Sequence, residues 1–198
     1  HPGADDNASG SAGILLIAEK MARAYAATDG DLRSVVFVGF SAEESGLHGS
    51  DFYVRNPVAP IEDHTLMMNF DMIGRITDRR LSLSGLETGY GLAEFVQPFI
   101  ERSPLTVIPK GSPRGSSDHT RFEDKEIPVL FAILEKLHGD RHTPRDVSSL
   151  INRVDAVHAA NLFYEIGMAA ALRSAPVAFQ PRGQRPPEAS DEVQSAQR

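Results

Sequence analysis

Acidic and imidazole side chains occur in four separate segments of the sequence, where they could do chemistry together. A cluster of carboxylates needs a counter-charge, because like charges raise one another's pKa, and a divalent cation supplies it. Carboxylate and imidazole ligands without thiolate suit a catalytic zinc site, with manganese or cobalt as alternatives. The candidate residues are Asp6, Glu43, Glu44, Asp71 and His142.

The adjacent pair Glu43 and Glu44 suggests two different roles. One Glu can bind a metal while its neighbour stays free as a base, which would deprotonate a metal-bound water for attack on a carbonyl. Each residue also has an ordinary structural interpretation: Asp6 could begin a helix, where the dipole favours acids, and the Glu pair could be a solvated loop. Because all four segments would converge, we favour a catalytic metal site over these structural interpretations.

Predicted strands would bring the four segments together. Apolar runs at 35–40, 66–70 and 128–134 predict strands that are buried on both faces, as in a parallel sheet. In open α/β sheets, ligands bind beyond the carboxyl ends of the strands. These three strands lead into the Glu pair, into Asp71 and into the loop with His142.

Helical patterns alternate with the strands, which predicts an α/β fold with helices on both faces of a sheet. Apolar residues at helical spacing predict helices at 9–27, 49–54, 91–102 and from the N-cap Asn152 to 172, with shorter strands at 81–83 and 105–108. After Arg173 the composition becomes rich in Pro, Gln, Ser and Arg. We therefore predict a single domain at 1–173 and a disordered tail or linker at 174–198.

Composition excludes several other classes of function. The 198 residues include 27 acidic and 20 basic side chains, and the net charge of −7 argues against nucleic acid or an anionic membrane surface as a partner. Cysteine is absent, which excludes disulfides, thiolate metal sites and a cysteine nucleophile. No apolar run approaches the length of a transmembrane helix. The motifs His-Glu-x-x-His and Gly-x-Ser-x-Gly of other hydrolases are absent too.

Five ordered motifs carry a family resemblance: GADDNASG at 3–10, AEESGLHGS at 42–50, NFDMIGR at 69–75, SDH at 117–119 and HTPRD at 142–146. With them the chain resembles, over about residues 3–172, the aminopeptidase Y and bacterial leucyl aminopeptidase family of co-catalytic dizinc exopeptidases. The resemblance implies a mixed, mainly parallel sheet flanked by helices, two zinc ions, a peptide substrate and a secreted or periplasmic location.

The resemblance also assigns roles to the candidate residues. It implies that Asp6 bridges both zinc ions, that Glu44 and His142 complete the shell of one zinc, and that Asp71 binds the other. Glu43 would be the general base. The motif places the bridging carboxylate at the second Asp of its pair, so no metal role is assigned to Asp5.

Two departures from the family pattern qualify this expectation. The family's first ligand is a His in a His-x-Asp motif shortly before residue 3, which the given chain does not contain; His1 lacks the Asp two residues on. We therefore expect the chain by itself to bind metal weakly and to be inactive. Many relatives also have Tyr where this chain has Arg141, which could stabilise an oxyanion as a cation or could be a surface residue.

Three alternatives to an aminopeptidase stay open on the sequence. Glutaminyl cyclases use the same fold with one zinc, and carboxypeptidase-type relatives attack the other end of a peptide. Some receptors keep the fold as a non-catalytic ectodomain after losing metal ligands. All four expected ligands within the given sequence are present, which favours an enzyme.

Overall fold

The computed structural model describes residues 1–112 and 115–185 and contains a mixed, mainly parallel sheet. Its four strands are β1 (Met67–Phe70), β2 (Arg80–Ser84), β3 (Thr106–Lys110) and β4 (Val129–Leu134). They lie in the order β1-β4-β2-β3. β1 is parallel to β4 and β2 is parallel to β3, whereas β2 and β4 are antiparallel. The predicted fold class is confirmed.

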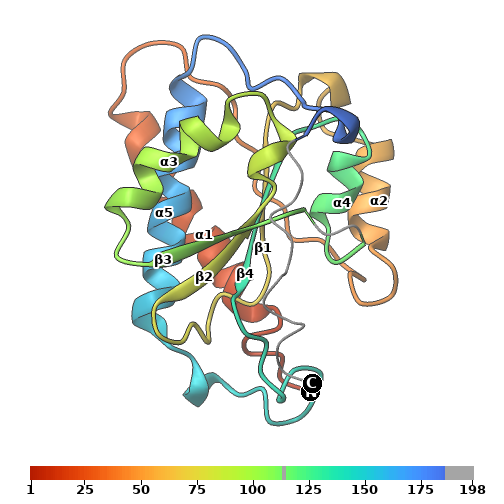
Figure 1. Cartoon of the computed structure of the whole chain (residues 1–198), viewed down its shortest axis with the longest axis vertical. Helices are drawn as coiled ribbons and strands as arrows, with labels where there is room; N and C mark the ends of the chain where they lie inside the picture. The colour runs from red at the N-terminus through yellow and green to blue at the C-terminus, as the bar shows by residue number, and fades with distance from the viewer. Residues whose placement is uncertain (113–114, 186–198) are drawn as a thin grey trace.

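Helices cover both faces of this sheet (Figure 1). On one side lie α1 (Ala8–Ala26), α3 (Leu92–Arg102) and α5 (Arg153–Leu172), and on the other lie α2 (His48–Arg55) and α4 (His119–Glu123). Short 3-10 helices are found at Ile61–Asp63, Leu86–Thr88, Ser148–Leu150 and Arg182–Gln184. The larger part of the core joins α1 and α5 to the sheet, and a smaller cluster lies under α2 and α4.

Each of the two long helices begins directly after an Asn whose side chain caps it. The Asn7 side chain accepts a hydrogen bond from the Gly10 N–H at the start of α1, and Asn152 accepts one from the Asp155 N–H at the start of α5. Each cap satisfies one of the backbone donors that a helix leaves unpaired at its first turn. Among the described residues, no helix is both long enough and apolar enough to cross a membrane.

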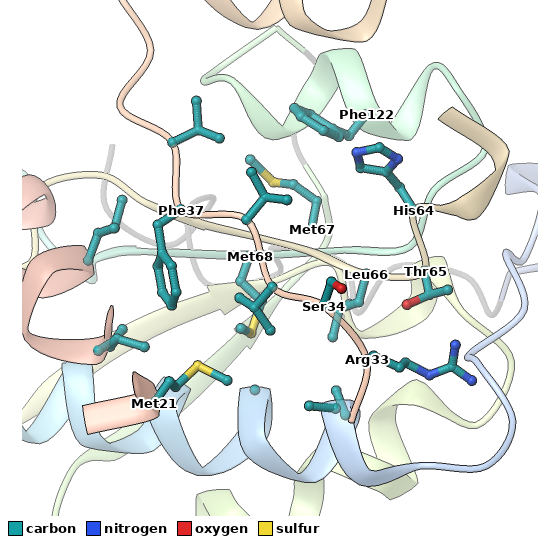
Figure 2. A pocket seen from close by; sticks show the side chains of 18 of the residues that line it. Met21, Arg33, Ser34, Phe37, His64, Thr65, Leu66, Met67, Met68 and Phe122 are labelled. Atoms are coloured by element: carbon teal, nitrogen blue, oxygen red, sulfur yellow. The ribbon is translucent and has the colours of Figure 1, made fainter. Parts of the chain in front are cut away.

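The prediction of a strand at 35–40 is wrong. The segment is not part of any described strand, and Val36 is 49% exposed. Residues 33–38 line a cavity of about 480 Å³ together with residues of β1 and α1 (Figure 2). Phe37, Met68 and Met21 lie around this cavity, which none of the five candidate site residues lines. Strand propensity favours an extended backbone, but a strand also needs a neighbouring edge within hydrogen-bond distance.

The predicted boundary after Arg173 is too early. The segment that follows packs against the body of the domain: Val177 is buried, and Phe179 pairs with Gly89 in an isolated β-bridge. Arg182 and Arg185 each lie 2.8 Å from a carboxylate oxygen of Glu123 on α4. Polar composition predicted a disordered segment here, but a buried acid holds it in place. The rest of the predicted tail, 186–198, lies outside the described residues.

Candidate metal and active site

Three of the four predicted metal ligands meet in the structure. His142 Nε2 lies 2.7 Å from Glu44 Oε1 and 2.9 Å from Asp6 Oδ2. One ligand atom from each residue lies within 4.8 Å of the other two. The three residues come from the loop before α1, the loop before α2 and the loop after β4.

The Asp6 carboxylate fits a bound cation. Its Oδ2 is buried and, although His142 Nε2 lies 2.9 Å from it, makes no hydrogen bond among the described residues. Burial raises the pKa of Asp6, and the charge of Glu44 raises it further. A buried acceptor without a donor is costly, and a divalent cation would satisfy it. Two carboxylates and one imidazole are also a ligand set that zinc accepts.

Asp71 lies beside this group but outside its three closest ligand atoms. It directly follows β1, and it accepts a hydrogen bond of 2.9 Å from the Ser117 hydroxyl. Burial raises the pKa of Asp71 to about 6 despite the Ser117 hydrogen bond, and the charge of Asp6 adds to the rise. Asp71 is therefore a second, half-buried carboxylate within electrostatic reach of Asp6.

Glu43 and Glu44 differ in their surroundings, as the two-role hypothesis requires. The Glu43 carbonyl accepts hydrogen bonds from the Gly46 and Leu47 N–H groups, which turns the chain tightly before α2. The Glu44 side chain is 57% exposed and contacts His142. Burial raises the pKa of Glu43 to about 7, and the nearby charge of Asp71 contributes. A carboxylate with a pKa near neutrality suits a general base.

Asn7 connects the loop that carries Asp6 to the end of β1. Its side-chain amide donates to the Phe70 carbonyl at 2.7 Å, and its Oδ1 accepts from the Met72 N–H at 3.1 Å. Two backbone groups that flank Asp71 are therefore held by the residue that follows Asp6. These two hydrogen bonds of Asn7 fix the positions of Asp6 and Asp71 relative to each other.

Several residues at the site received no role from the sequence. Asp118 is buried, and burial raises its pKa. His138 is another, and its Nε2 lies 2.9 Å from Oδ2 of the fully buried Asp5. Asp146 is fully buried as well. Asp118 and Asp146 lie within two of the five motifs, which was the available signal.

Two other side chains lie near His142. The ring of His1 lies 6.3 Å from the ring of His142, centroid to centroid, although His1 contributes no atom to the ligand group. Arg141 is exposed. Burial and Glu44 raise the pKa of Asp6, and the charge of Arg141 partly opposes them. Arg141 therefore lies within electrostatic reach of the site.

We expect the metal-free protein to lose stability as the pH rises from about 4.5 to about 7. The pKa of Glu43 is raised from 4.5 in the unfolded state to about 7 in the folded state. The contribution of Glu43 to the free energy of unfolding is therefore fully present below pH 4.5 and is lost as the pH rises through about 7. Because solvent screens this partly exposed group, we expect the free energy of unfolding to fall by about 1 kcal/mol, which corresponds to a decrease of about 2–4 °C in Tm. Thermal unfolding of chelator-treated protein in a series of buffers measures the effect.

Glu43→Gln is the control for this pH dependence. Because Gln does not titrate, the Tm of the metal-free variant should fall less steeply over the same range. An equally steep fall in the variant would show that Glu43 is not a source of the effect.

Comparisons with known proteins identify the family of the chain. The model of peptidase family M28 matches residues 1–166. Leucine aminopeptidase 2 of Trichophyton rubrum is 46% identical over 140 residues, which cover 65% of this chain and 27% of that protein. The chain thus spans about a quarter of the length of this curated relative.

Two solved structures share the fold. The LapA aminopeptidase of Legionella pneumophila superposes with a TM-score of 0.74 at 23% identity, over 87% of this chain and 48% of that one. A zinc aminopeptidase of Bacillus subtilis superposes with a TM-score of 0.69 at 24% identity, over 90% of this chain and 45% of that one. Because the family model covers most of the chain, including all five candidate residues, the chain belongs to peptidase family M28.

Proposed function

We propose that the protein containing this chain is a zinc-dependent aminopeptidase that hydrolyses the N-terminal peptide bond of peptides. The observation that carries the proposal is the convergence of ligand atoms from Asp6, Glu44 and His142. Glu43 lies beside them, and burial is the main cause that raises its pKa to about 7. Relatives named as aminopeptidases, one of them a zinc enzyme, support the same conclusion.

Asp6, Glu44 and His142 would hold one zinc ion, and Asp6 and Asp71 would contribute to a second. A further ligand for the second ion would come from a His-x-Asp segment upstream of residue 3, as the family resemblance implies. When bound, zinc supplies a Lewis acid that polarises the scissile carbonyl and lowers the pKa of water to about 7.

Glu43 would move the proton in this reaction. Its carboxylate would take the proton of the attacking water and then pass it to the leaving amine. A pKa of about 7, which burial raises from 4.5, lets the same group accept and release a proton at neutral pH. The remaining acidic groups would hold the positively charged α-amine of the substrate, which would make the enzyme an exopeptidase.

We further propose that Arg141 stabilises the oxyanion of the tetrahedral intermediate in place of the Tyr found in many relatives. Removal of one oxyanion donor typically costs about 10²–10³-fold in kcat. Because Arg141 is exposed, we expect Arg141→Ala to lower kcat by about 10-fold to 100-fold while KM changes little. Steady-state kinetics measure both constants. An unchanged kcat would make Arg141 a surface residue.

The test of the proposed function is release of p-nitroaniline from leucine p-nitroanilide by the full-length protein, with and without chelator. Turnover that chelator abolishes and zinc restores would support the aminopeptidase. No turnover by a folded protein with two bound zinc ions would point to a carboxypeptidase or a cyclase. No turnover and no bound zinc would favour a binding module.

The proposed secreted or periplasmic location is tested by cell fractionation of the source organism.

A further inference from the structure

Asp146 is a buried acid whose carboxylate holds the backbone of the loop that carries Asp6. The carboxylate is fully buried and accepts the Asp5 N–H on both oxygens, at 3.0 and 3.1 Å. Its Oδ2 also accepts the Asp6 N–H at 3.0 Å. The Asp146 carbonyl accepts the N–H of Ala4 at 3.2 Å. Three consecutive N–H groups before α1 are thus bound by one residue.

Asp146 also belongs to the loop that carries His142. Its N–H donates to the Thr143 carbonyl at 3.2 Å, and the Thr143 N–H donates to the Asp140 carbonyl at 3.1 Å. Successive turns therefore fix Asp146 relative to His142. Asp146 connects the two loops that supply Asp6 and His142, whose ligand atoms lie 2.9 Å apart.

A second contact joins the same two loops but does not reach Asp6. His138 Nε2 lies 2.9 Å from Asp5 Oδ2, and the Asp5 Oδ1 accepts the Gly74 N–H at 2.7 Å. This contact anchors the side chain of Asp5 to the interior of the domain. The hydrogen bond that the Asp6 N–H donates to Asp146 is different, because it acts on the residue whose own Oδ2 lies 2.9 Å from His142 Nε2.

We infer that Asp146 is a positioning residue for the zinc site: its carboxylate sets the position of the Asp6 carboxylate relative to His142. The inference rests on the proposed function. Charge-assisted hydrogen bonds to backbone N–H groups are short and directional, so they fix the position of a loop well. Residues that orient metal ligands in this way typically affect metal affinity by about 10–100-fold.

The test compares Asp146→Asn with a matched control, Asp155→Asn, in the full-length protein. Asp155 is also buried and accepts a hydrogen bond from the Asn152 amide at 2.8 Å, but it is on α5 and outside the candidate site. Both variants lose a buried charge, so both should lower Tm. Zinc affinity, measured by competition with a chromogenic chelator, should fall by about 10–100-fold in Asp146→Asn alone.

Three outcomes separate the inference from the proposed function. Wild-type protein that binds no zinc would overturn the proposed function itself. Wild-type protein that binds zinc, together with an Asp146→Asn variant that binds it equally tightly, would overturn only the inference. If Asp146→Asn does not fold, Asp146→Glu replaces it, since it keeps the charge and displaces the carboxylate. Unchanged zinc affinity in a folded Asp146→Glu would overturn the inference too.

Discussion

Replacement of Glu43 by Gln should lower kcat by about 10²–10⁴-fold and leave zinc binding intact. Gln keeps the size of the side chain but cannot accept a proton from water. Burial raises the pKa of Glu43 to about 7, so the wild-type group is matched to proton transfer near neutral pH. The three closest ligand atoms come from other residues, so the metal site should persist.

The measurement pairs kcat on leucine p-nitroanilide with the zinc content of the purified full-length variant. Glu94→Gln, at an exposed position on α3, is the matched control and should retain both. A Glu43→Gln variant with full zinc content and activity within about threefold of wild type would exclude Glu43 as the general base. Loss of zinc in the same variant would instead make Glu43 a ligand.

Most helices and strands could be predicted from the sequence because local chemistry determines them. The Asn caps of α1 and α5 lie immediately before the helices that the apolar spacing predicts, and β4 follows its apolar run almost residue for residue. The segment 35–40 is the instructive exception. Its apolar residues predict a strand, but strand formation depends on an edge contributed by another part of the fold, which local composition does not report.

The candidate ligands could also be predicted, since each lies at the end of a predicted element or within a motif. The structure brings Asp6, Glu44 and His142 together as their types and order suggest. The supporting residues could not be predicted in the same way. Asp146 lies within the last of the five motifs, but its carboxylate accepts backbone N–H groups of a loop that is distant in sequence, and the motif does not reveal such a contact.

The proposed zinc site should fail when His142 is replaced. Asn is the better replacement, because the His142 backbone has a φ of 58°, a left-handed conformation that Asn tolerates more readily than most residues. His142 Nε2 lies within 2.9 Å of both other ligand atoms, and it is the one nitrogen ligand between two carboxylates. Its loss should weaken zinc binding by more than about 100-fold, above the cost of losing a supporting residue.

Chelator competition measures this change, and His48→Asn provides the matched control. His48 is exposed at the start of α2 and contributes no atom to the ligand group, so its variant should bind zinc as tightly as wild type. If His142→Asn instead binds zinc like the control, the contacts of His142 with Asp6 and Glu44 are ion pairs of a metal-free loop. The metal would then have to be held elsewhere, around Asp71 and Glu43, and the division of roles between the two adjacent glutamates would be reversed.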